Sequence, residues 1–347
     1  MKKYFSVLLF ANICLAVNAQ NKSDKEPYLT KSLSGETVNS VRAETSGGNI
    51  SVTGGNQSDS RVEVFIWQNG NKLKALSGDE LKVKVDEDYD LDVSVKDSKL
   101  TVTAKPKHRI TDWKKALNFS FRIYVARNVT TGLETSGGNI ELAGLSGNQE
   151  FTTSGGNLAL KDLDGKIKGR TSGGNISFRD LKDDVDLTTS GGNIQAENSS
   201  GSINISTSGG SIELSGLKGN IKASTSGGNI GGETIEGDLS AHTSGGNVSL
   251  HGLNCGLKAG TSGGNIDVSV ASIVKDISIN NAAGNVNLTI PRNKGIDLKL
   301  YANRISTETL QDFKGKNTKE EINGTLSGGG IPVKVDAGGG KINLEFN

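Results

Sequence analysis

Hydrophobic and polar positions repeat along this chain with a period of 18 residues. Between Thr135 and Ile266 the phrase TSGGNI, or a close variant of it, occurs eight times without a change of spacing. A fixed period of this length is typical of a protein built from stacked repeats. The Asn of the phrase, replaced once by Ser, falls at Asn139, Asn157, Asn175, Asn193, Ser211, Asn229, Asn247 and Asn265.

Within one repeat, apolar side chains alternate with polar ones. After Asn157, Leu158 and Leu160 occupy the first and third positions, and Ile167 occupies the tenth. This alternation with a period of two predicts short strands with one buried face. Paired glycines would each cost a helix about 1 kcal/mol relative to Ala, which disfavours a helical repeat. Each repeat is therefore expected to form two strands and two turns.

Strands that return once per repeat in the same direction must pair in parallel. The pattern thus predicts an all-β fold: a single-stranded parallel β-solenoid, similar to a β-helix or β-roll, with 18-residue coils and irregular N- and C-terminal capping coils. Right-handed winding is expected from the general preference of parallel crossovers. One coil buries too little apolar surface to offset its loss of backbone entropy. Its stability must come from neighbouring coils.

The Gly-Gly-Asn phrase marks one turn of every coil. We expect the glycines to supply backbone angles that are costly for other residues. Stacking places each Asn about 4.8 Å from the next, where side-chain amides can form a hydrogen-bonded ladder. We interpret the row as a structural turn ladder, with a ligand-binding ridge as the alternative. An earlier copy of the phrase adds Asn49 to the row, 90 residues before Asn139.

The ends of the chain depart from the repeat. Lys2 and Lys3, an apolar run and a Val-Asn-Ala site are typical of a secretory signal peptide over residues 1–19. The polar residues 20–36 predict a flexible leader. One solenoid domain is then expected over residues 37–347, divided into irregular N-terminal coils (37–130), regular repeats (131–280) and C-terminal coils (281–347).

Two features of the N-terminal coils bear on their structure. Leu81, Val83 and Val85 alternate with polar residues, which predicts a strand. Trp67 and Trp113 lie at the edges of two expected loops. An exposed aromatic pair can stack on a sugar ring, while the alternative is that both side chains seal the end of the hydrophobic core.

Composition limits the function classes. The net charge is +1, from 39 basic and 38 acidic residues, which gives no electrostatic case for a nucleic-acid partner. No segment after residue 19 is apolar enough to predict a transmembrane helix. After signal cleavage Cys255 is the only cysteine, and it occupies a column otherwise held by glycine, so we interpret it as a turn substitution.

Two other classes of protein share parts of the pattern. A calcium-stabilised β-roll also makes 18-residue coils, but its G-G-x-G-x-D-x-U-x motif requires an Asp in each turn. A polysaccharide-acting β-helix enzyme requires paired acids in a lateral groove, and the outward columns here show no recurring pair. His108, His242 and His251 are interpreted as surface residues, and no Ser is accompanied by a recognisable base. We expect no catalytic residue, metal site or cofactor.

Longer passages resemble a known family. The segment FSFRIYVARNVTTGLETSGGNIELAGLSGN, the recurring TSGGNI phrases and the VNLTIP segment are similar to the bacterial adhesin-like β-strand-repeat family of domains of unknown function. That family is related to auto-transporter adhesin head domains. The resemblance covers nearly all of the chain after the signal peptide, and it implies an exported β-solenoid without catalytic residues.

These observations predict a non-catalytic exported protein, either an adhesin or an envelope-associated binding or scaffold protein. Its expected partner is an envelope or extracellular glycan or protein, or a second copy of the chain. The expected location is periplasmic, cell-surface or secreted.

Overall fold

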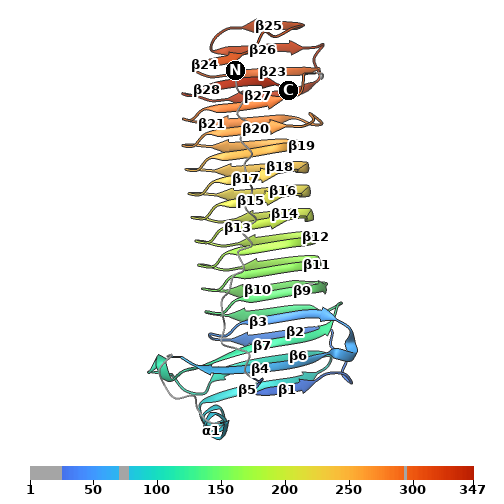
Figure 1. The fold of residues 1–347 in the computed structure, drawn as a ribbon, viewed down its shortest axis with the longest axis vertical. Coiled ribbons are helices and arrows are strands. Elements are labelled where there is room, and N and C mark those ends of the chain that lie inside the picture. Colours follow the sequence, from blue (N-terminus) through green and yellow to red (C-terminus); the bar gives the residue numbers. More distant parts are fainter. Residues whose placement is uncertain (1–25, 70–77, 293–294) are drawn as a thin grey trace, which may run out of the picture.

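The computed structural model describes residues 26–69, 78–292 and 295–347. Their strands stack along one axis, with the N-terminal strands at one end and the C-terminal strands at the other (Figure 1). The expected all-β fold is confirmed. The predicted signal peptide, residues 1–19, lies outside the described residues.

The central coils run from β8 to β21. Their bounds are β8 (Thr130–Thr135), β9 (Ile140–Ser146), β10 (Gln149–Thr153), β11 (Leu158–Arg170), β12 (Ile176–Thr188), β13 (Ile194–Glu197), β14 (Ser200–Ser206), β15 (Ile212–Ser215), β16 (Lys218–Thr225), β17 (Ile230–Glu233), β18 (Glu236–Thr243), β19 (Val248–Thr261), β20 (Ile266–Val270) and β21 (Ile277–Asn281).

Pairing between these coils follows the period of the sequence. β11 pairs in parallel with β12, so that Leu158 lies opposite Ile176 and Ile167 lies opposite Val185. Strands β12 to β19 continue with the same 18-residue offset. The alternating Ile, Leu, Val and Ala side chains point inward, and they form one hydrophobic core along the axis. The parallel register expected from the sequence is thus present in this part of the chain.

Successive coils are joined at the TSGG corner by the Thr side chain. The buried Thr171 hydroxyl donates a hydrogen bond to the carbonyl oxygen of Gly156 in the preceding coil, at 2.7 Å. It also accepts one from the N–H of Gly174, at 3.2 Å. The same two bonds recur at Thr135, Thr153, Thr189, Thr207, Thr225, Thr243 and Thr261. A buried hydroxyl with both bonds satisfied explains why Thr opens the phrase.

The expected reason for the paired glycines is wrong. Among the described residues, the glycines with positive φ all lie outside the TSGG corners. The second glycine of each pair instead lies against the coil before it: a Cβ on Gly156 would be 1.8 Å from the carbonyl oxygen of Gly138. A Cβ on the first glycine, Gly155, would come no nearer than 3.7 Å to any neighbour. Close approach of two backbones, and not backbone angle, requires glycine here.

The N-terminal end is not a series of irregular coils. Its elements are β1 (Leu29–Ser32), β2 (Ser40–Thr45), β3 (Ile50–Gly55), η1 (Gln57–Asp59), β4 (Arg61–Gln68), α1 (Gly78–Asp88), β5 (Tyr89–Lys96), β6 (Lys99–Pro106), η2 (Trp113–Lys115) and β7 (Leu117–Ala126). Three antiparallel pairs, β1 with β4, β4 with β7 and β5 with β6, contradict a wholly parallel solenoid.

Two expectations for this end are wrong for local reasons. Leu81, Val83 and Val85 belong to α1 and not to a strand, because Glu, Leu and Lys favour a helix and Asp79 and Glu80 occupy its first turn. The flexible leader expected over residues 20–36 instead contains β1. Leu29 in β1 packs on the core, and Leu33, directly after β1, is fully buried.

Of the described helices, none is long and apolar enough to cross a membrane.

The 90-residue spacing between Asn49 and Asn139 does not represent five coils. The N–H of Asn139 donates to Oδ1 of Asn49 at 2.9 Å, and Ile50 lies opposite Ile140, so the two copies of the phrase are in adjacent coils. The chain between them forms the end layers, with β7 pairing on the other side of β3.

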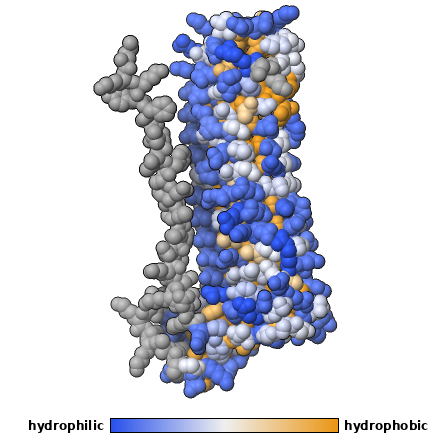
Figure 2. Space-filling model, turned by 45° about the vertical axis from the view of Figure 1, so that its right-hand side comes forward, coloured by the Kyte–Doolittle hydropathy of each residue, from blue (hydrophilic) through white to orange (hydrophobic). Residues whose placement is uncertain are grey.

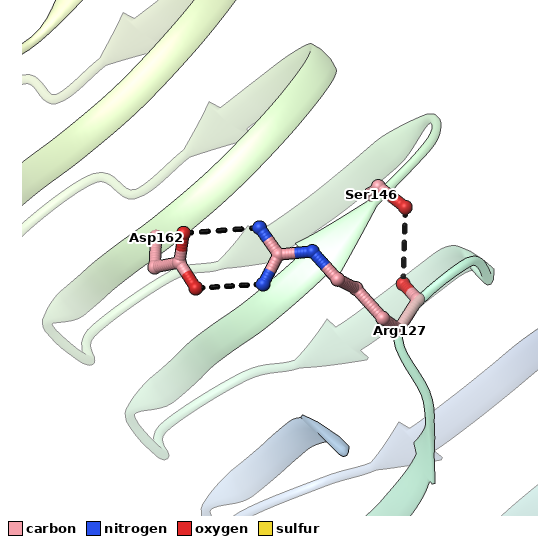
Figure 3. Close-up of polar contacts among 3 residues, drawn as sticks. All are labelled: Arg127, Ser146 and Asp162. Atoms are coloured by element: carbon pink, nitrogen blue, oxygen red, sulfur yellow. Dashed lines mark hydrogen bonds and ion pairs between the residues drawn. The ribbon is translucent and has the colours of Figure 1, made fainter. Parts of the chain in front are cut away.

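An ion pair ties these end layers to the regular coils (Figure 3). The Arg127 guanidinium, just after β7, donates to both carboxylate oxygens of Asp162 in β11, at 2.7 and 3.0 Å. The Ser146 hydroxyl donates to the carbonyl oxygen of Arg127 at 3.4 Å. The guanidinium lowers the pKa of the Asp162 carboxyl. Both side chains are half-exposed, so the pair contributes at most about 1 kcal/mol.

The C-terminal end also departs from a simple solenoid. Its strands are β22 (Val286–Ile290), β23 (Ile296–Tyr301), β24 (Arg304–Thr307), β25 (Phe313–Asn317), β26 (Glu321–Leu326), β27 (Ile331–Asp336) and β28 (Lys341–Phe346). β22 pairs in parallel with β28 and β28 with β24. β26 pairs antiparallel with both β23 and β25, which closes this end of the stack.

The close approach at the corner predicts different outcomes for two adjacent substitutions. Gly156→Ala places a Cβ against the backbone of the preceding coil, and we expect a loss of about 3 kcal/mol or more in the free energy of unfolding. Gly155→Ala is the matched control, with an expected change within about 1 kcal/mol. Denaturant unfolding of both variants measures the difference, and equal losses would contradict this explanation.

The register predicts the effect of removing one whole period. Without residues 175–192, Asn193 and Ile194 take the places of Asn175 and Ile176 in the register, so we expect a folded protein. Removing only residues 175–183 would turn inward side chains outward and should cause unfolding. Circular dichroism with thermal melting compares the two deletions. Equal melting temperatures of the two deletions, or a lower one for the full-period deletion, would refute the assigned register.

Candidate ligand-binding groove

The recurring turn phrase produces one row of side chains on the surface. Each row residue accepts a hydrogen bond from the backbone N–H of the next, and the bonds from Asn157 to Asn139 and from Asn175 to Asn157 both measure 2.8 Å. Ser211 interrupts the row, and its hydroxyl accepts from the N–H of Asn229 at the longer distance of 3.2 Å. The row contains all the residues expected from the sequence: Asn49, Asn139, Asn157, Asn175, Asn193, Ser211, Asn229, Asn247 and Asn265.

The bonding differs from the expected ladder of amides. Each Oδ1 is bound by a backbone N–H and not by the neighbouring amide, because the pleat directs that N–H toward the preceding coil. The amide nitrogen is left at the surface, and within the described part of the chain no group accepts a hydrogen bond from Nδ2 of a row asparagine. The row is therefore a line of fixed hydrogen-bond donors, about 4.8 Å apart.

The row continues beyond the regular repeats. The N–H of Asn285 donates to Oδ1 of Asn265 at 2.9 Å, and the N–H of Lys341 donates to Oδ1 of Asn285 at 3.1 Å. Arg304 in β24 lies opposite Lys341 in β28 and ends the row. The sequence analysis missed these three residues because loops break the period. The looser phrases NAAGNV and AGGGKI were the signal that could have identified Asn285 and Lys341.

A groove of about 690 Å³ lies over this C-terminal part of the row. One side is the row itself, and the other is the next outward residue of each strand, two positions along the chain. The row supplies Asn247, Asn265, Asn285, Lys341 and Arg304, and the second column supplies Ser249, Asp267, Asn287, Asn343 and Ser306. Below these side chains, Val248 and Ile342 are buried in the core. The groove thus presents amides, hydroxyls and charges.

The charges of the groove are unbalanced. Arg304 and Lys341 contribute +2 and Asp267 contributes −1, so the lining carries a net charge of +1. No ion pair of the described residues includes any of these three side chains. Both cations are exposed and are free to bind an anionic group of a ligand.

A smaller depression, of about 240 Å³, lies over the outward side chains of β9, β11, β12 and β13. Its charged lining residues are Glu141, Lys161, Arg179 and Glu197, so its formal charges balance. The larger groove differs from it in its excess of cations.

Trp67 does not line either depression. Trp67 lies in β4 and is 38% exposed. Trp113 begins η2, close in sequence to β7, and β7 is the strand that pairs with β4. Stacking of this pair on a sugar ring stays a prediction.

One hydrogen bond joins a serine hydroxyl, which can act as a nucleophile, to a histidine ring, which can act as a base. The Ser249 hydroxyl and Nε2 of His251 are 2.9 Å apart, a pair that the sequence analysis did not identify. Both side chains are exposed, and no described carboxylate bonds to the His251 ring, so nothing orients the imidazole as a general base requires. Within the described residues, no group of three or more His, Cys, Asp or Glu side chains is placed to hold a metal ion.

Cys255 is not the turn residue expected from its column. It lies in β19 opposite Gly237, it has no positive φ, and its side chain is 1% exposed within the hydrophobic core. Burial, with a smaller contribution from Asp238, raises the pKa of its thiol to about 11. The thiol is therefore neutral and inaccessible at physiological pH.

Comparison with known proteins identifies a family. The model of the family described as Toastrack DUF4097 matches residues 15–345, which is nearly the whole chain. A comparison with curated proteins finds no match. The crystal structure of a "putative cell adhesion protein" from Clostridium sporogenes is similar over 92% of this chain and 98% of its own, with 12% identity and a TM-score of 0.18. At that TM-score the similarity carries no argument about fold or function.

The buried thiol predicts slow chemical modification. At pH 8 a pKa near 11 in place of 9.0 lowers the thiolate fraction about a hundredfold. We expect alkylation of Cys255 by iodoacetamide to be at least that much slower in the native protein than in guanidinium chloride. Mass spectrometry of the Cys255 peptide measures both rates. Equal rates in the two conditions would show that the thiol is accessible in the native state.

Proposed function

We propose that this chain, which belongs to the Toastrack DUF4097 family, is an exported, non-catalytic binding protein of the adhesin type that holds a carbohydrate in its polar groove. The observation that carries the proposal is the groove itself. Fixed amide donors, hydroxyls and charges line it in two parallel columns. Polar groups in such an arrangement match the closely spaced hydroxyl groups of a glycan.

A carbohydrate suits the lining better than a protein partner does. Stable protein interfaces contain a central apolar region rich in aromatic residues. The apolar residues of the groove, Val248 and Ile342, are each only 1% exposed, so they offer almost no apolar contact area. Figure 2 shows a face on which hydrophilic residues predominate and hydrophobic residues form only a broken stripe.

Self-association through the ends of the stack is disfavoured. At the C-terminal end the edge strand β25 carries Lys314 and Lys316, and charged residues on an edge strand oppose pairing with another sheet. At the N-terminal end, Nζ of Lys31 donates to the carbonyl oxygen of Val93 at 2.8 Å and so satisfies part of the edge strand β5. Both features favour a partner bound along the side of the molecule.

The proposal has three further parts that rest on the sequence. Residues 1–19 act as a signal peptide, so the protein is periplasmic, cell-surface or secreted. Residues 37–347 act as one domain, to which β1 and Leu33 also belong because they pack on the single hydrophobic core of the described residues. The coils wind in the right-handed sense. Fractionation of intact cells with surface proteolysis tests export, and a protein confined to the cytoplasm would refute it.

A binding assay tests the function. We expect the purified protein to bind at least one member of a panel of neutral and charged polysaccharides in a saturable way, and to release no new reducing or unsaturated ends during prolonged incubation. Isothermal titration calorimetry measures binding, and a reducing-end assay measures cleavage. Failure to bind any member of the panel would refute the carbohydrate-binding function. Cleavage that stops in the Ser249→Ala variant would show instead that the protein is an enzyme.

A further inference from the structure

We infer that the ligand of the groove is an acidic polysaccharide that carries carboxylate groups of the uronic acid type, and that Arg304 and Lys341 bind those carboxylates. This inference rests on the proposed carbohydrate-binding function and names the class of carbohydrate.

The row side of the groove offers mainly hydrogen-bond donors. Oδ1 of Asn247, Asn265 and Asn285 already accepts a backbone N–H, while the Nδ2 hydrogens of these side chains have no acceptor among the described residues and are available to a ligand. A guanidinium and an ammonium group can only donate. This side of the groove is therefore complementary to a ligand rich in acceptors, and a carboxylate is the strongest acceptor that a polysaccharide commonly carries.

The two cations of the groove lack the acid partner that several other exposed cations have. Several other exposed cations are neutralised by a neighbouring acid, as Lys218 is by Glu236 and Lys275 by Asp238. Arg304 and Lys341 lie opposite each other on β24 and β28 and form no ion pair with a described residue. Two adjacent unpaired cations repel each other, and a ligand carboxylate between them would remove that repulsion.

The direction of the ligand follows from the direction of the row. The amide donors recur once per coil, about 4.8 Å apart, a spacing comparable to the length of one pyranose ring. A polymer lying along the axis of the stack can therefore place successive sugars against successive coils. The cations occupy the C-terminal end of the groove, while Ser249 and Asp267 on the second column can accept hydrogen bonds from sugar hydroxyls.

A matched pair of ligands tests the inference. Oligogalacturonates and their fully methyl-esterified forms share the same rings and linkages, but only the free acids carry negative charge. We expect the full chain to bind the free acid at least tenfold more tightly than the ester, with an affinity that falls as salt is added. Calorimetric titration of both ligands at two salt concentrations measures this difference.

Variants identify the residues responsible. Arg304→Gln with Lys341→Gln should weaken binding of the free acid at least tenfold, to about the level of the ester. Lys222→Gln with Lys258→Gln is the matched control, because both lysines are exposed, lie outside the groove and form no ion pair among the described residues. It removes the same charge and should change binding less than twofold.

A third variant tests the amide donors without breaking the row. Asn265→Ser keeps a hydroxyl acceptor for the N–H of Asn285, as Ser211 does for Asn229, but deletes the Nδ2 donor. We expect an unchanged melting temperature and a severalfold weaker binding of the free acid. If the charge variant were unstable, this variant would still decide the role of the row.

The outcomes separate the inference from the function on which it rests. Equal binding of acid and ester, or equal losses in the groove and control variants, overturns the inference and leaves carbohydrate binding intact. Binding to neutral glycans alone also overturns it. Failure to bind any acidic or neutral glycan overturns both. Tight binding of the acid that is lost in the groove variant supports both.

Discussion

The close contact between successive backbones at the TSGG corner is the constraint on which the rest of the structure depends. The second glycine lets one coil rest on the carbonyl of the coil before it, and the buried Thr hydroxyl bonds across the same gap. The Asn amide then binds the next coil from the outside. The distance between successive coils along the axis is thus fixed, so side chains at equivalent positions form straight columns. Without that alignment neither the continuous core nor the surface row could exist.

Much of this architecture could be predicted from the sequence because the repeat is local and regular. An 18-residue period with alternating apolar positions determines the parallel register, and it was enough to place the eight residues from Asn139 to Asn265 in one row. The roles of individual atoms were harder to predict. The position of the Gly156 carbonyl is not visible in a pattern of residue types, and therefore the glycines were assigned to backbone angles and the asparagines to an amide ladder.

The ends could not be predicted in the same way because their contacts are long-range. A strand pattern of three alternating residues suits a helix equally well when the surrounding residues are Glu, Lys and Asp, as in α1. The groove depends on Lys341 and Arg304. Lys341 follows Asn285 in the row and Arg304 follows Lys341, although Arg304 comes before Lys341 in the sequence. The phrase AGGGKI marks Lys341 as a turn residue, but no local pattern indicates that Lys341 lies beside Asn285 or that Arg304 lies beside Lys341. The proposed function therefore depends on the part of the chain where the repeat is weakest.

The adjacency of Asn49 and Asn139 has a consequence for how the molecule folds. Neighbouring regular coils form contacts between residues 18 positions apart, whereas this contact closes a loop of 90 residues. Loop-closure entropy alone makes the longer closure about 1.4 kcal/mol less favourable. Nucleation of folding is accordingly favoured among the regular coils, where each new coil can pair with the edge of a coil that has already formed. The N-terminal layers would dock last, and the stack would grow from its middle toward its ends.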